Sequence, residues 1–120
     1  MNSYETIADM SIDNLIRMAI DVEAEKAREK YGRYFNSHHE AWAVLKEEIE
    51  EVGQEAKQLD WCMDDLWMKV KTDEDPELTL VRMKGIAKRF IQEALQVAAM
   101  IDKYTLTNEL MNRMKEEDAQ

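Results

Sequence analysis

The residues of this sequence best suited to chemistry are a run of acids, EEIEE at residues 47–51, followed by Glu55. On a helix with about 100° per residue, Glu48, Glu51 and Glu55 form a row along the edge of an apolar stripe. Carboxylates crowded there repel one another and resist ionisation unless a cation neutralises them. Mg²⁺ suits such a row, because it prefers hard oxygen ligands and is content with a few carboxylates plus water.

A solvated acidic face is the alternative interpretation of the same run. Lys46 and Lys57 are close enough in sequence to serve as ion-pair partners on the surface of a helix. The position of Glu48 between Leu45 and Val52 on the helical wheel favours a metal site over simple solvation.

A later helix offers an opposing carboxylate, Glu93. It projects from a mostly apolar segment, where an ionised group needs a partner. Gln96 follows Glu93 one turn later. Arg89 precedes Glu93 by one turn, a spacing that also allows an ordinary salt bridge between them. Lys84 and Lys88 could contact phosphate or simply keep the helix solvated.

These side chains need helices to position them, and the composition favours an all-α chain. Only three glycines and one proline occur in 120 residues, and helix-favouring residues dominate. We expect a single domain over residues 1–120, a helical bundle of two long and two shorter helices. The expected helices are 11–31, 37–71, 75–104, and a short C-terminal helix capped by Thr105 or Thr107. A shorter helical turn is expected near residues 4–9.

Local signals set the ends of these helices. Ser11 is expected to be an N-cap, and Gly32 to follow the C-terminus of the same helix. Ser37 and Glu40 match a capping box, in which Glu40 reaches back to the start of the helix. Residues 75–77, Asp-Pro-Glu, are typical of an N-cap, a proline at the first helical position and an acid in the first turn.

Charge and composition exclude several classes of partner. The net charge of −10 repels nucleic acid and anionic membranes. No apolar run approaches the roughly 20 residues of a membrane helix, and the polar, acidic N-terminus is unlike a signal peptide. The single cysteine, Cys62, is expected to pack in the core. We therefore expect a cytoplasmic protein without nucleic-acid or membrane partners.

Three tryptophans lie off the main apolar stripe: Trp42, Trp61 and Trp67. They could stack a base or fill a second interface, and the pattern favours an interface between subunits.

Two segments resemble a known family. The run at residues 45–52, LKEEIEEV, is similar to the EExxE element of the MazG-like all-α NTP pyrophosphohydrolases, whose second element is ExxD. The wider segments, 37–51 and 93–100, resemble MazG-like proteins of phages and prophages. The resemblance covers roughly residues 11–104.

The resemblance implies a function and a set of ligands. Glu47, Glu48 and Glu51 would be metal ligands from the first element, and Glu93 from the second, with Gln96 as a further oxygen ligand. The implied activity is hydrolysis of a nucleoside triphosphate, NTP or dNTP, to the monophosphate and pyrophosphate with Mg²⁺ or Mn²⁺. The implied assembly is a homodimer or homotetramer.

Gln96 departs from this pattern, because it stands where the family has Asp. An amide oxygen can bind a cation but brings no charge, and Asp102 is not at the motif's spacing. The alternative is therefore a weak or inactive MazG-like protein, possessing the bundle and acting by binding a nucleotide or a host protein. A third possibility is a helical interaction module whose acids merely solvate it.

Overall fold

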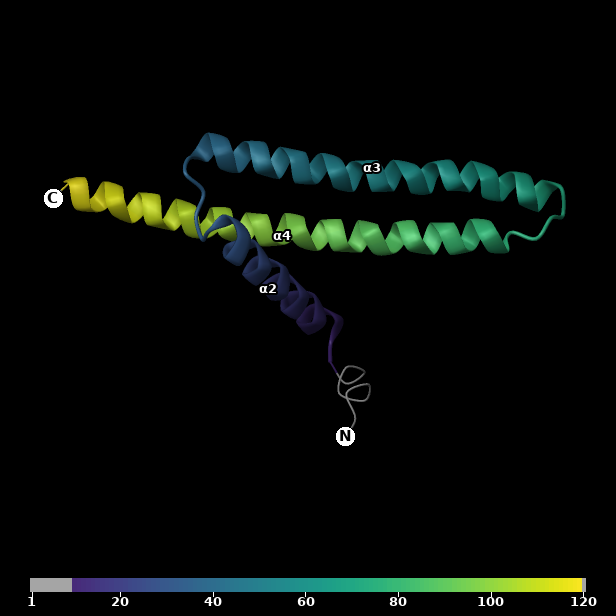
Figure 1. Cartoon of the computed structure of the whole chain (residues 1–120), viewed down its shortest axis with the longest axis horizontal. Coiled ribbons are helices and arrows are strands. Elements are labelled where there is room, and N and C mark those ends of the chain that lie inside the picture. Colours follow the sequence, from purple (N-terminus) through teal and green to yellow (C-terminus); the bar gives the residue numbers. More distant parts are fainter. Residues whose placement is uncertain (1–9, 120) are drawn as a thin grey trace. The chain divides into compact units, whose positions relative to one another are not determined.

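The computed structural model describes residues 10–119, and all regular structure in that range is helical. The helices are α2 (Ile12–Tyr31), α3 (His38–Lys71) and α4 (Glu77–Ala119) (Figure 1). The predicted all-α class is confirmed for the described residues. The helical turn expected near residues 4–9 lies outside them. None of the described helices combines the length and apolarity needed to cross a membrane.

The helix ends follow the local sequence signals. The side chain of Ser11 accepts a hydrogen bond from the first turn of α2 at 3.2 Å, and Gly32 ends this helix with φ 88°. The Ser37 hydroxyl accepts from the backbone N–H of Glu40 at 3.1 Å. Glu40 reaches one residue further back than a capping box requires, and accepts from the backbone and side-chain N–H groups of Asn36.

The prediction of a fourth helix is wrong, because α4 continues unbroken to Ala119. Thr105 and Thr107 do not cap a new helix. Their hydroxyls donate to the carbonyls of Ile101 at 3.0 Å and Lys103 at 2.8 Å, four residues earlier. This bonding satisfies both hydroxyls inside a helix. No glycine or proline follows residue 85, so nothing in the sequence breaks the helix.

The chain divides into two compact units, which are described separately. Met1–Leu45 and Leu95–Gln120 form one, called the terminal unit below, and Lys46–Ala94 form the other, called the hairpin unit. Both α3 and α4 run through both units, and the prediction of a single domain stays a prediction.

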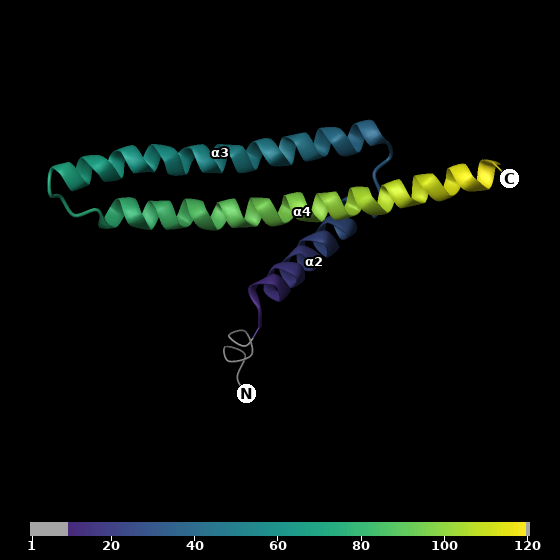
Figure 2. The same ribbon diagram turned by 180° about the vertical axis from the view of Figure 1, so that it is seen from behind.

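In the hairpin unit, α3 and α4 run antiparallel and side by side (Figures 1 and 2). Cys62 and Ile86 are buried where the helices meet, as is the side chain of Thr79. The Thr79 hydroxyl donates to the Asp65 carboxylate at 2.6 Å, which satisfies this buried hydroxyl. The prediction that Cys62 packs in the core is confirmed.

The terminal unit is organised around the buried ring of Phe35. The Phe35 N–H donates to the hydroxyl of Thr107 at 3.0 Å, and its ring meets that of Tyr104 edge-on, with centroids 6.2 Å apart. His38 Nδ1 lies 2.6 Å from the Tyr104 hydroxyl. The segment between α2 and α3 is thereby fixed against α4.

Candidate metal centre

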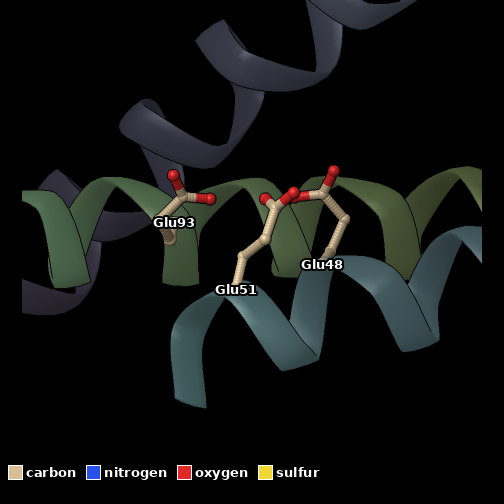
Figure 3. Close-up of side chains that lie close together, drawn as sticks. All are labelled: Glu48, Glu51 and Glu93. Carbon is tan, nitrogen blue, oxygen red and sulfur yellow. The ribbon is translucent and has the colours of Figure 1, made fainter. Parts of the chain in front are cut away.

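Three carboxylates from two helices meet in the hairpin unit. Glu48 and Glu51 lie one turn apart on α3 and extend toward α4, which carries Glu93 (Figure 3). One oxygen from each carboxylate lies within 4.8 Å of the others. A Mg²⁺ ion holds its oxygens at about 2.0–2.1 Å, so two of its ligands are at most about 4.2 Å apart. The group is therefore within small side-chain rotations of a shared ion.

Two oxygens of this group are buried without a hydrogen-bond partner among the described residues, Glu48 Oε2 and Glu93 Oε2. Burial raises the pKa of Glu48, and the neighbouring charges of Glu51, Glu93 and Glu47 raise it further. Burial also raises the pKa of Glu93. A side-chain hydrogen bond with Glu51 and the charges of Glu51 and Glu55 raise this pKa further. The surroundings thus destabilise the ionised forms of the Glu48 and Glu93 carboxylates. A bound cation would stabilise these ionised forms instead.

Glu55 places a fourth acid beside the group, one heptad after Glu48. Its Oε1 lies 3.5 Å from Nε of Arg89 on α4, and its side chain is 16% exposed. Its Oε2 is buried without a partner among the described residues. The i, i+4 salt bridge that the sequence allows between Arg89 and Glu93 does not form; Arg89 pairs across the hairpin with Glu55 instead. The positive charge of Arg89 offsets the charge of one of the four carboxylates, so an excess of negative charge remains.

The other residues singled out from the sequence lie around this group or elsewhere. Glu47 is exposed and is not one of the three clustered carboxylates, although its charge contributes to the raised pKa of Glu48. Lys84 and Lys88 are exposed on α4. Gln96 and Asp102 belong to the terminal unit, where Gln96 is partly buried and Asp102 exposed.

The sequence placed Glu55 in the acidic row suited to Mg²⁺, but the ligand set expected from the resemblance did not include it. Its spacing from Glu48, seven residues, was the available signal, because two helical turns return to the same face. Its partner Arg89 could not be found this way, since the pairing depends on how the two helices are aligned.

No protein-family model matches the chain, and comparison with curated proteins and with solved structures finds no significant match.

Proposed function

We propose that this chain is a Mg²⁺-dependent nucleoside triphosphate pyrophosphohydrolase, which converts an NTP or dNTP to the monophosphate and pyrophosphate. The observation that carries the proposal is the meeting of Glu48, Glu51 and Glu93, with a buried, unpartnered oxygen on Glu48 and on Glu93. The resemblance of residues 47–51 and 93–96 to the two metal-binding elements of the MazG-like family supports the same activity.

The donor set fits a hard divalent cation. All three side chains offer carboxylate oxygens, the ligands that Mg²⁺ and Mn²⁺ favour. Glu48, Glu51 and Glu93 would hold the ion, and its charge would offset the repulsion that raises the pKa of Glu48 and Glu93. When bound, Mg²⁺ would neutralise phosphate charge and make a water molecule more acidic.

Residues around the group would bind and orient the substrate. Lys84, Lys88 and Arg89 follow one another along α4, and we assign them to the phosphate groups. The side chain of Arg89 is 54% exposed although it is paired with Glu55, so part of its guanidinium can reach a ligand. Glu47 is exposed beside Glu48, where its carboxylate can accept a hydrogen bond from the attacking water.

Assembly into a homodimer or homotetramer in the cytoplasm is part of this proposal. A hairpin of two helices covers only one side of each, and large apolar side chains of the hairpin unit lie exposed on the rest. They include Ile49, Trp61, Trp67, Met68, Val70, Leu78, Val81 and Ile91. Exposed apolar surface of this extent is typical of subunit interfaces, and four helices make a stable bundle where two do not.

The test is pyrophosphate release from a panel of NTPs and dNTPs, with and without Mg²⁺. We expect release from at least one nucleotide only when Mg²⁺ is present. Glu48→Gln should lower the rate by roughly 100-fold or more, because losing a direct ligand costs at least as much as losing an outer-shell partner, which costs about 10–100-fold. Glu50→Gln is the matched control, because Glu50 is exposed on the same helix and pairs with Lys46. Absence of release from every nucleotide, or equal rates in wild type and Glu48→Gln, would refute the activity.

A second candidate, a nucleotide-binding relative without activity, is favoured by Gln96. In that case the metal site remains but the chemistry is lost. Mg²⁺ should then raise the melting temperature in a saturable way that Glu51→Gln abolishes, as expected for binding to the folded state alone. A saturable rise without pyrophosphate release selects this candidate, and no rise at all contradicts both.

A further inference from the structure

Apolar side chains recur at seven-residue intervals along both helices of the hairpin unit. The series on α3 consists of Ile49, Ala56, Met63 and Val70, and a second series of partly buried residues lies beside it, Val52, Leu59 and Leu66. The series on α4 consists of Leu80, Ala87 and Ala94, beside the partly buried Met83 and Phe90. Two apolar positions in each heptad are typical of helices that pack against other helices along that stripe.

The buried residues show which way these series face. Cys62 is buried where α3 meets α4, and the next residue, Met63, is exposed. Ile86 is buried on α4, and the next residue is Ala87. One residue further along a helix is a rotation of about 100°. Since α3 and α4 are right-handed and antiparallel, this rotation leads from both helices to the same side of the hairpin (Figures 1 and 2). This side, called the seam face below, carries Ile49, Ala56, Met63, Val70, Leu80, Ala87 and Ala94.

The opposite side of the hairpin carries the residues that directly precede the buried ones, and it is apolar only near the loop. Trp61 and Leu78 are exposed there. One and two heptads before Trp61, however, stand Gln54 and Glu47, and two heptads after Leu78 stands Gln92, all of them exposed. Only the seam face is therefore apolar along the whole hairpin unit.

The seam face is large enough for a stable interface. The α3 and α4 segments of the hairpin unit are about 39 and 27 Å long at 1.5 Å per residue. With each helix about 10 Å wide, the face covers roughly 650 Å². Two such faces in contact bury about 1,300 Å², which lies within the range of about 1,200–2,000 Å² for stable protein interfaces.

A second copy of the chain fits this face in charge and in pattern. The seam face contains no ionisable side chain, so two chains of net charge −10 meet there with less repulsion than at the acidic surfaces. The second copy also presents two helices of the same length and heptad spacing. Four helices of this kind enclose a common core, which a two-helix hairpin cannot do alone.

We propose that the seam face docks the seam face of a second copy, so that two hairpins form a four-helix bundle. The opposite side, with Trp61 and Leu78, stays outside this interface. Both copies use the same surface, as in a dimer with two-fold symmetry. The inference rests on the assembly part of the proposed function and specifies its surface, but it does not depend on pyrophosphate release.

The test is sedimentation velocity of the full chain over a range of concentrations, with two matched pairs of variants. Met63→Glu and Ala56→Glu each place a carboxylate on the seam face, at positions that are exposed in a single copy. Trp61→Glu and Gln54→Glu, two residues earlier on α3, add the same charge to the opposite side. We expect the wild type and the second pair to self-associate. The first pair should associate about 100-fold more weakly or less, because a carboxylate without a counter-charge is costly in an apolar contact.

Two results would overturn the proposal: a monomeric wild type, or equal loss of association in the two pairs of variants. Circular dichroism of all four variants checks that the helices remain, and Ala56→Glu gives an answer even if Met63→Glu does not fold, because Ala56 is exposed and Glu favours helix. Pyrophosphate release is measured on the same samples. Release by a monomeric wild type would overturn this inference and leave the activity, whereas association through the seam face without release would do the reverse.

Discussion

Carboxylates lie where α3 meets α4 at two places in the hairpin unit, and the hydrogen bonding of the carboxylates differs between the two places. Asp65 accepts a hydrogen bond from the buried Thr79 hydroxyl at 2.6 Å, beside a core that includes Cys62 and Ile86. Glu48 and Glu93 each carry a buried oxygen without a donor among the described residues. Both arrangements use the same two helices, so the difference comes from the residues opposite each acid.

The comparison separates an acid that completes the fold from acids that need something from outside. The Asp65–Thr79 bond satisfies a buried hydroxyl, and buried polar groups in folded proteins generally have such a partner. At Glu48 and Glu93 burial and neighbouring carboxylates raise the pKa, a cost that the fold alone does not remove. Groups held in a costly ionisation state are frequently found at functional sites.

The largest expected effect is at the satisfied acid. Asp65→Ala leaves the buried Thr79 hydroxyl without its acceptor, and should lower the free energy of unfolding by about 1–3 kcal/mol. Urea unfolding followed by circular dichroism measures this change. Asp64→Ala, at the exposed neighbouring position, is the control and should change stability by no more than about 0.5 kcal/mol. Equal losses in the two variants would mean that the hydrogen bond does not stabilise the hairpin.

At Glu48, whose buried oxygen has no hydrogen-bond donor among the described residues, a substitution should change the free energy of unfolding in the opposite direction. Without metal, Glu48→Gln removes one charge from the group and should raise the free energy of unfolding, by up to about 1 kcal/mol since the site is partly solvated. Glu50→Gln removes an equal charge but loses an exposed ion pair with Lys46, and should leave stability nearly unchanged or slightly lower. Thermal unfolding in EDTA gives both values. Destabilisation by Glu48→Gln would show that this carboxylate already contributes to the fold as Asp65 does.

Local signals in the sequence predicted the helix ends well, because a cap depends on a few adjacent residues. Ser11, Gly32 and Ser37 act as expected. The break expected at Thr105 is absent, since a threonine that caps a helix and one that bonds to the carbonyl four residues back look the same in sequence.

Interhelical contacts were harder to predict, because the apolar pattern of α3 is wider than the face that α4 covers. On α3 the apolar side chains of Met63 and Val70 are exposed, while Cys62, next to Met63 in sequence, is buried. The hydrophobic pattern shows which residues favour burial, but not which of them a single neighbouring helix will reach. The pairing of Arg89 with Glu55 was missed for the same reason, since it depends on the alignment of the two helices.

The smallest expected effect is a pH dependence that belongs to Glu48 and Glu93. Their pKa values are raised in the folded protein, so between the ordinary and the raised pKa the folded state binds more protons than the unfolded state. The free energy of unfolding of the metal-free protein therefore falls as pH rises through this window. Melting temperatures in EDTA should accordingly rise on acidification from neutral pH, and rise less in the double variant Glu48→Gln/Glu93→Gln.

Mg²⁺ should reverse the sign of the difference in pH dependence between the wild type and the double variant. Protons and the ion compete for the same carboxylate oxygens, so the stabilisation by Mg²⁺ weakens as pH falls through the raised pKa values. At saturating Mg²⁺ the wild type should lose stability on acidification relative to the double variant, and in EDTA it should gain. Asp65→Ala leaves Glu48, Glu51 and Glu93 in place, so it should shift both curves downward without altering this reversal. If the wild type and the double variant show the same pH dependence in both conditions, the titration belongs to other groups and Glu48 and Glu93 are not the ligands.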